Sequence, residues 1–137
     1  TGDGGFQMNI QEMATAVTQG TGITICLLNN NYLGMVRQMQ ELFYGKRYSA
    51  TCLRRRPSCP GGCKGPNDQC PEYVPDFVKL AESYGAYGIR VEKEEDIDAA
   101  FAEAKKHTDV PTIIEFMIAT DELVLPMVKS GNPMILK

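Results

Sequence analysis

Two kinds of hydrophobic spacing alternate along this chain. Four stretches have an apolar residue every three or four positions, the spacing of an amphipathic helix: residues 6–18, 33–43, 75–85 and 94–107. Three short, nearly continuous apolar runs are rich in β-branched residues, as buried parallel strands are: residues 23–28, 88–91 and 111–118. Because the predicted helices and strands alternate, we expect βαβ units and an α/β fold, with a parallel sheet and helices on both faces.

Local signals mark where several of these elements end. Gly20 and Gly22 follow the first predicted helix, and Gly85 follows the third. The last predicted helix has acidic residues in its first turn and Lys105–His107 in its last turn, which suits the helix dipole at both ends. The remaining stretches are expected to be irregular: residues 44–74 and 121–137.

Composition narrows the class of protein. With 137 residues, one domain, 1–137, is expected. Fourteen basic and 17 acidic residues give a formal charge of −3, which argues against nucleic acid as a partner of the chain as a whole. No apolar run reaches the roughly 18 residues of a membrane span, and no signal peptide is seen, so we expect no membrane partner and a cytoplasmic location. A ligand motif at the very first residue leads us to expect a domain incomplete at its N-terminus.

That motif combines glycines, a carboxylate and a helix start. Gly2-Asp3-Gly4-Gly5 opens the first predicted helix, where backbone N–H groups and the helix dipole favour a phosphate. Asp3 would repel that phosphate unless a divalent cation lay between them, and Mg²⁺ prefers hard oxygen ligands. Asn30, 27 residues further on at the end of a predicted strand, offers a second such oxygen. Taken singly, Gly-Asp-Gly is also an ordinary turn and Asn29–Asn31 a polar strand end; the pair favours the cation site.

The motif pair and its surroundings resemble the catalytic subunit of acetolactate (acetohydroxyacid) synthases, in the C-terminal domain that binds thiamin diphosphate. The resemblance covers nearly the whole chain outside residues 51–72. The segments that carry it are Gly2–Glu12, Leu27–Asn30, Leu33–Gln38, Leu42–Tyr44, Arg47–Ser49, Pro75–Ala81 and Val124–Val128.

The resemblance implies roles for individual residues. Mg²⁺ would be held by Asp3, by the Asn30 side chain and by the backbone carbonyl of Tyr32. Met35 and Met39 would line the substrate channel, and most relatives have tryptophan at the position of Met39, where the ring favours 2-oxobutyrate and stacks on sulfonylurea-type inhibitors. Contacts with thiamin diphosphate are implied for Gly2, Asp3, Gly4, Gly5, Asn30, Tyr32, Leu33, Gly34 and Met35.

The resemblance also implies an activity that this chain does not hold alone. The family joins pyruvate to a second 2-oxo acid, pyruvate or 2-oxobutyrate, with loss of CO₂, in branched-chain amino-acid biosynthesis. Its activating glutamate lies in an N-terminal domain of the partner subunit, and its FAD in a middle domain. We therefore expect an inactive fragment of a homodimer or higher oligomer, with a regulatory small subunit as a candidate partner. The alternatives are another thiamin-diphosphate-dependent decarboxylase or carboligase, and a non-catalytic metal-binding or redox module.

A cysteine-rich insertion, residues 51–72, stands outside the resemblance. Cys52, Cys59, Cys63 and Cys70 are separated by six, three and six residues, and the charges between Glu41 and Asp68 are all positive. Four thiolates could hold Zn²⁺ or an iron–sulfur cluster, with the arginines offsetting their charge. The spacing is not that of paired zinc knuckles, so a solvated loop with free thiols is the alternative.

Overall fold

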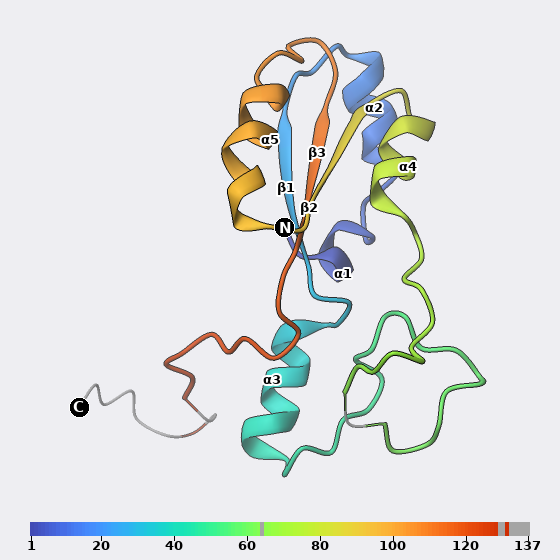
Figure 1. The fold of residues 1–137 in the computed structure, drawn as a ribbon, viewed down its shortest axis with the longest axis vertical. Helices are drawn as coiled ribbons and strands as arrows, with labels where there is room; N and C mark the ends of the chain where they lie inside the picture. Colours follow the sequence, from blue (N-terminus) through green and yellow to red (C-terminus); the bar gives the residue numbers. More distant parts are fainter. Residues whose placement is uncertain (64, 129–130, 132–137) are drawn as a thin grey trace.

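The computed structural model describes residues 1–63, 65–128 and 131, and its centre is a parallel sheet. The strands are β1 (Thr24–Asn29), β2 (Tyr87–Val91) and β3 (Thr112–Met117), in the order β1-β3-β2 (Figure 1). In the register of the sheet, Glu115 of β3 is paired with Leu27 of β1 on one side and with Arg90 of β2 on the other. The predicted parallel α/β sheet is confirmed.

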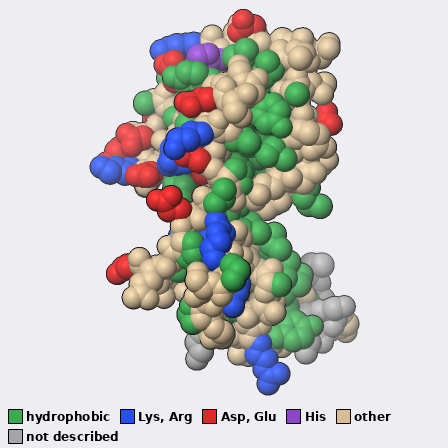
Figure 2. All heavy atoms as spheres, turned by 90° about the vertical axis from the view of Figure 1, so that its right-hand side faces the viewer, with side chains coloured by type: hydrophobic (Ala, Val, Ile, Leu, Met, Phe, Trp, Pro, Cys, Tyr) green, Lys and Arg blue, Asp and Glu red, His purple; other side chains and the backbone are tan. Residues whose placement is uncertain are grey.

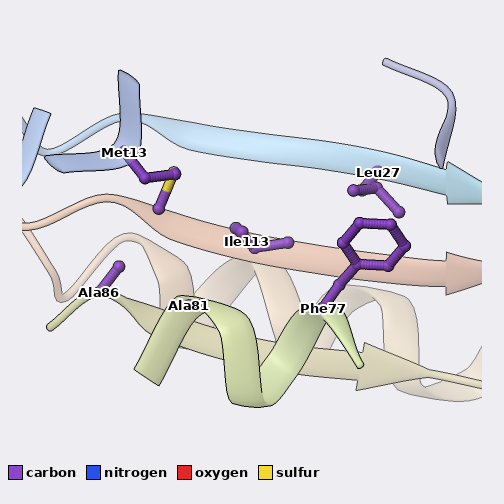
Figure 3. Close-up of a cluster of buried hydrophobic side chains, with 6 residues drawn as sticks. All are labelled: Met13, Leu27, Phe77, Ala81, Ala86 and Ile113. Carbon is purple, nitrogen blue, oxygen red and sulfur yellow. The ribbon is translucent and has the colours of Figure 1, made fainter. Parts of the chain in front are cut away.

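Helices cover both faces of this sheet, as predicted (Figure 1). One face packs against α2 (Glu12–Thr18) and α4 (Phe77–Ser83), the other against α5 (Ile97–Ala104). Consecutive residues of a strand point to opposite faces, so Ile113 and Ile114 belong to different cores. Figure 3 shows the first core: Met13, Leu27, Phe77, Ala81, Ala86 and Ile113. The second core contains Val91, Ala100, Ala104 and Ile114.

Two predicted helices are shorter in the structure than their patterns indicated. The helix expected over residues 6–18 is two helices, α1 (Asp3–Phe6) and α2. Between them and at the start of α2, five amides bond to carbonyls three residues back, namely those of Met8, Asn9, Glu12, Met13 and Ala14. The helix expected over 94–107 is a 3₁₀ turn, Glu94–Asp96, followed by α5, which ends at Ala104. The amides of Lys106 and His107 again bond three residues back, so these basic residues lie just beyond the helix.

Outside the sheet, α3 (Gly34–Phe43) extends away from the rest of the domain (Figure 1). The segment that follows it, up to α4, contains no helix or strand in its described residues. The chain after β3 returns to α3, where the Gln38 side chain donates to the Val124 carbonyl at 2.7 Å and accepts from the Val124 amide at 2.8 Å. No described helix is long and apolar enough to cross a membrane.

Candidate functional site

Asp3 lies at the carboxyl end of β1. Gly2 forms a parallel bridge to Leu28, and the Leu28 amide donates to the Thr1 carbonyl at 2.8 Å, so residues 1–2 run alongside the strand. The chain then turns into α1, whose first residue is Asp3. This places the predicted phosphate motif beside the loop that leaves β1, where a parallel sheet binds its ligands.

The Asp3 carboxylate is buried, with 2% of the residue exposed. Burial raises its pKa, although hydrogen bonds from the Gly4 backbone and the Tyr73 side chain act in the opposite direction. One carboxylate oxygen, Oδ2, has no hydrogen-bond partner among the described residues. A buried carboxylate with a free oxygen is unfavourable unless a cation is supplied, so the donor set at Asp3 fits a metal ion.

Tyr73 is a part of this site that sequence reasoning missed. Its hydroxyl accepts a 2.7 Å hydrogen bond from Gln7 Nε2 and lies against Asp3. Burial first, and then the Asp3 charge, raise the pKa of Tyr73 above its ordinary value. The neutral hydroxyl is therefore an available donor to the carboxylate. No local pattern indicated this contact, because Tyr73 lies in the irregular segment 70 residues away.

The loop after β1 is shaped by its own asparagines. Asn29 Oδ1 accepts from the Asn31 amide and Asn30 Oδ1 from the Tyr32 amide, both at 3.0 Å, and Asn31 has a positive φ of 64°. Asparagine tolerates this left-handed conformation better than most residues. The Tyr32 carbonyl accepts no backbone hydrogen bond from the described residues. Its lone pairs, like those of Asn30 Oδ1, are therefore candidates for a cation.

All nine residues predicted to contact the cofactor line one cleft of about 500 Å³. This volume lies within the usual range for small-molecule sites. Met35 is among the nine, but Met39, one turn further along α3, is not among the residues lining the cleft and is 45% exposed. The cleft is also lined by residues that the sequence analysis did not identify: Met8, Leu28, Val36, Gln38, Ile118, Ala119, Glu122 and Val124.

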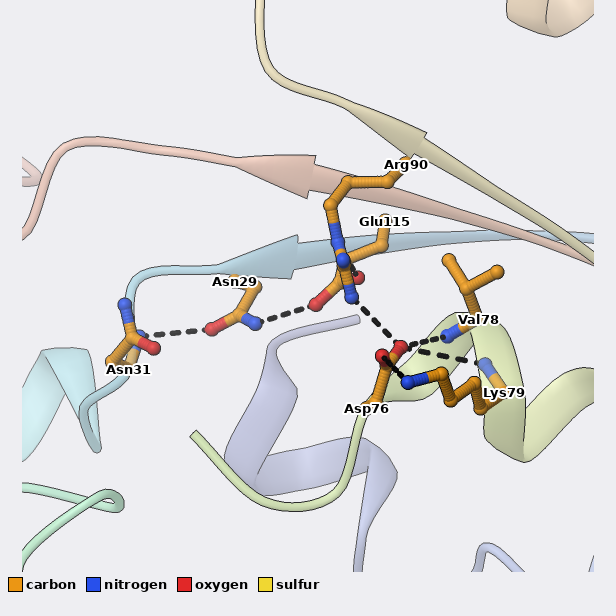
Figure 4. Close-up of polar contacts among 7 residues, drawn as sticks. All are labelled: Asn29, Asn31, Asp76, Val78, Lys79, Arg90 and Glu115. Atoms are coloured by element: carbon orange, nitrogen blue, oxygen red, sulfur yellow. Dashed lines mark hydrogen bonds and ion pairs between the residues drawn. The ribbon is translucent and has the colours of Figure 1, made fainter. Parts of the chain in front are cut away.

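A charge network around the buried Glu115 carboxylate joins the strands to α4 (Figure 4). Glu115 of β3, 2% exposed, accepts from Asn29 Nδ2 at 2.7 Å and from Arg90 Nε at 2.8 Å. Arg90 also donates to Asp76 at 2.8 Å, and Asp76 caps the start of α4 by accepting from the amides of Val78 and Lys79. The signal in the sequence was a single charge, Glu115, inside an apolar strand.

The four cysteines of the insertion lie elsewhere, around a second cavity beside α3. They are half-buried free thiols. Among the described residues, no group of three or more His, Cys, Asp or Glu side chains is arranged to hold a single metal ion. The second metal site therefore stays a prediction.

Known proteins match this chain along most of its length. The model of the family "Thiamine pyrophosphate enzyme, C-terminal TPP binding domain" matches residues 1–116. The chain is 44% identical over 131 residues to the acetolactate synthase large subunit of Corynebacterium glutamicum, covering 96% of this chain and 19% of that protein. It is 38% identical to the mitochondrial acetolactate synthase catalytic subunit of Saccharomyces cerevisiae, covering 96% of this chain and 16% of that protein.

A solved structure supports the same assignment. The thiamine diphosphate-dependent 4-hydroxybenzoylformate decarboxylase of Rhodococcus jostii is similar, with a TM-score of 0.63 and 28% identity, over 89% of this chain and 19% of that one. The chain thus spans 16–19% of the length of these proteins. The resemblance to acetolactate synthases indicated by the motifs is confirmed. The chain belongs to the thiamine pyrophosphate enzymes, and what it contains is their C-terminal cofactor-binding domain.

Proposed function

We propose that this domain binds thiamin diphosphate through Mg²⁺ at the cleft described above. Asp3, the Asn30 side chain and the Tyr32 carbonyl would hold the cation, and the backbone at Gly2, Gly4 and Gly5 would line the diphosphate. The observation that carries this proposal is the buried Asp3 carboxylate, whose Oδ2 has no partner in a cleft lined by these same residues. When bound, the cofactor supplies a thiazolium carbon that adds to a 2-oxo acid.

The protein's own residues hold the cofactor and exclude water. Apolar side chains from β1, α3 and the chain after β3 face the cleft, including Leu28, Met35 and Ile118. The network of Glu115 and Asn29 fixes the start of the loop that carries Asn30. Pre-positioned ligands of this kind lower the cost of binding, because little ordering is left to be done.

We further propose that the whole protein is an acetolactate synthase, which joins pyruvate to a second 2-oxo acid and releases CO₂. Relatives so named are 35–45% identical to this chain among bacteria, against 28% for the decarboxylase structure. Because that similar structure is a decarboxylase, a 2-oxo-acid decarboxylase is the second candidate for the function of the whole protein. FAD, the activating glutamate, a regulatory subunit and a cytoplasmic location stay predictions.

We also propose that a second copy of the chain, the partner that the resemblance implies, covers part of α3. α3 buries Arg37 and Gln38 but exposes apolar side chains. An apolar helix stripe of this kind is normally covered in the assembled protein. The exposed apolar side chains of α3 are Met35, Val36, Met39 and Leu42, and Leu33, just before the helix, is exposed as well.

The cation site is tested by titrating the full-length protein with thiamin diphosphate at fixed Mg²⁺. Asp3→Asn should weaken binding by more than about 100-fold, and Asn30→Ala by about 10- to 100-fold, since Asp3 is the charged ligand. Asp98→Asn, an exposed carboxylate on α5, is the matched control and should bind as wild type does. Unchanged affinity in the Asp3 variant would falsify the assignment.

The thermal stability of the protein without cofactor is a second test of the role proposed for Asp3. Because burial raises the pKa of Asp3 in the folded protein, ionisation of this group opposes folding, and the penalty is present above the folded-state pKa. Asp3→Asn removes the charge. Without cofactor, the variant should therefore unfold at the same or a higher temperature than wild type at neutral pH, while losing the stabilisation that Mg²⁺ and thiamin diphosphate give wild type.

The reaction itself is tested by product analysis. The full-length protein, given pyruvate, should release acetolactate rather than free acetaldehyde, whereas the second candidate predicts the aldehyde. The isolated 137-residue chain should form neither product, since the activating glutamate is expected elsewhere. Turnover by the purified chain alone would contradict that expectation.

A further inference from the structure

The insertion encloses a second cavity, of about 280 Å³, that shares only Tyr32 with the cofactor cleft. All four of its cysteines line this cavity: Cys52, Cys59, Cys63 and Cys70. None forms a disulfide, and each is half-buried. Four free cysteines that line one cavity offer the ligand type that zinc sites and iron–sulfur clusters use.

The charge of the cavity wall suits a ligand of negative net charge. Arg37, Arg54 and Arg55 line it, and no Asp, Glu or His is among its described lining residues. The buried Nε of Arg54 has no hydrogen-bond partner among the described residues. Four thiolates around a core of charge +2 leave a net charge of −2, which three guanidinium groups can offset. Figure 2 shows Lys and Arg side chains on the lower part of the molecule with few acidic side chains beside them, whereas those on the upper part lie among acidic ones.

Two of the thiols receive backbone hydrogen bonds. The Arg56 amide donates to Cys59 Sγ at 3.4 Å, and the Asn67 amide donates to Cys70 Sγ at 3.3 Å. In each case the cysteine closes a tight turn by donating its own amide to the carbonyl three residues back, at 3.0 Å. N–H donors to sulfur are among the contacts that tune the potential of a cluster bound through cysteine.

The arrangement favours a cluster over a single ion. Zn²⁺ needs four ligands converging on one point at about 2.3 Å, and no three such side chains converge in this way among the described residues. The four cysteines instead line one cavity of about 280 Å³, and an iron–sulfur core of several ions is held by four Cys thiolates spread around it. We propose that Cys52, Cys59, Cys63 and Cys70 bind an iron–sulfur cluster, with Arg37, Arg54 and Arg55 balancing its charge.

This cluster would act on the cofactor loop through Cys52. Cys52 forms an antiparallel bridge with Tyr32, in which the Leu33 amide donates to Thr51 at 2.8 Å and the Leu53 amide donates to Asn31 at 3.0 Å. Anchoring Cys52 thus fixes the backbone that carries Asn30 and Tyr32, a consequence that rests on the proposed cofactor site.

The cluster is tested on the full-length protein, purified without oxygen, by analysing iron, acid-labile sulfide and zinc. We expect equal iron and sulfide, about two or four of each per chain, and a broad visible absorption that dithionite bleaches. The double variant Cys59→Ser/Cys63→Ser should lose both signals. Cys26→Ser, in β1 and outside the cavity, should keep them. Zinc without sulfide, no metal at all, or full iron in the double variant would each overturn the proposal.

Removing the cluster from wild-type protein and rebuilding it tests the site without any substitution that could disturb folding. Wild-type protein stripped with ferricyanide and a chelator should recover its absorption when iron and sulfide are returned anaerobically, and failure to recover it counts against the site. Thiamin diphosphate affinity, measured before and after stripping, should fall by about 3- to 10-fold and then recover. An unchanged affinity overturns the link to the loop. Iron and sulfide content is independent of thiamin diphosphate binding, so a failure of the cofactor site is recognised separately.

Discussion

The side-chain amide of Asn29 donates a 2.7 Å hydrogen bond to the buried carboxylate of Glu115. This bond joins β1 to β3 at the point where the chain leaves the sheet toward Asn30. Oδ1 of the same Asn29 side chain accepts a 3.0 Å hydrogen bond from the Asn31 amide (Figure 4). One side chain therefore connects the sheet to the loop. The position of the candidate cation ligand thus depends on a charge buried in the central strand.

Glu115→Ala should therefore lower both stability and cofactor affinity. The Asn29 amide loses its acceptor inside the protein, and Arg90, 38% exposed, loses one of its two carboxylates. We expect the free energy of unfolding to fall by about 2–4 kcal/mol, as measured by urea denaturation. The control is Glu103→Ala, which breaks a surface pair with Lys106 on α5 and should change little. If both substitutions lower the free energy of unfolding equally, the network around Glu115 contributes no more to stability than a surface ion pair.

Asp76 should make stability dependent on pH. Partial burial raises its pKa, but the Lys79 amide and the Arg90 charge together outweigh that effect and lower the pKa below 3.8. A carboxylate with a lowered folded-state pKa stabilises the protein above its unfolded-state pKa, and that stabilisation is lost as the pH falls through the folded-state value.

Asp76→Asn keeps the helix cap and removes only the charge. At neutral pH it should cost about 1 kcal/mol, from a partly exposed ion pair and the helix dipole. The difference from wild type should vanish when the pH drops below the folded-state pKa. Urea midpoints compared at neutral and acidic pH measure this, with the surface substitution Asp109→Asn as control. A difference that persists in acid would mean that the charge is not its source.

Gly34→Ala should separate cofactor binding from stability. A Cβ at Gly34 would lie 2.8 Å from Nδ2 of Asn30, so the Asn30 side chain has to move. Gly34 begins α3, where alanine is tolerated in the helix. We expect thiamin diphosphate affinity at fixed Mg²⁺ to fall about 10-fold, about 1.4 kcal/mol, with little loss of thermal stability. Gly61→Ala, where nothing lies within 4 Å of the new Cβ, should bind normally.

Met39→Trp tests whether α3 lines the substrate channel of the whole enzyme. Met39 is 45% exposed and lies outside the cleft of this chain, so other parts of the protein must complete such a channel. An aromatic face adds about 0.5–1.5 kcal/mol when it stacks on a ligand. The variant should bind a sulfonylurea about 2- to 12-fold more tightly and raise the ratio of acetohydroxybutyrate to acetolactate. If neither value changes, the role inferred for Met39 is wrong.

Much of the fold could be predicted because it depends on local patterns. Apolar runs in β1, β2 and β3 and helical spacing in α3 and α4 are properties of short windows, and burial of those faces is what folding requires. Asp3 and Asn30 could also be identified as candidate ligands, because their residue types and positions suit a cation beside a phosphate. Their cleft is lined by all nine residues that the resemblance named.

Tertiary structure determined the features that no short stretch of sequence indicates. Helix ends differ from the predicted ones, since the shift to bonds three residues back after Phe6 and Ala104 leaves the apolar spacing unchanged. Tyr73 reaches Asp3, and Glu115 reaches Asn29, across 70 and 86 residues of sequence. The insertion showed four thiols and a run of positive charge, but only folding placed them around one cavity and joined Cys52 to Tyr32. Contacts between distant residues depend on how the strands pair, which hydrophobic spacing does not specify.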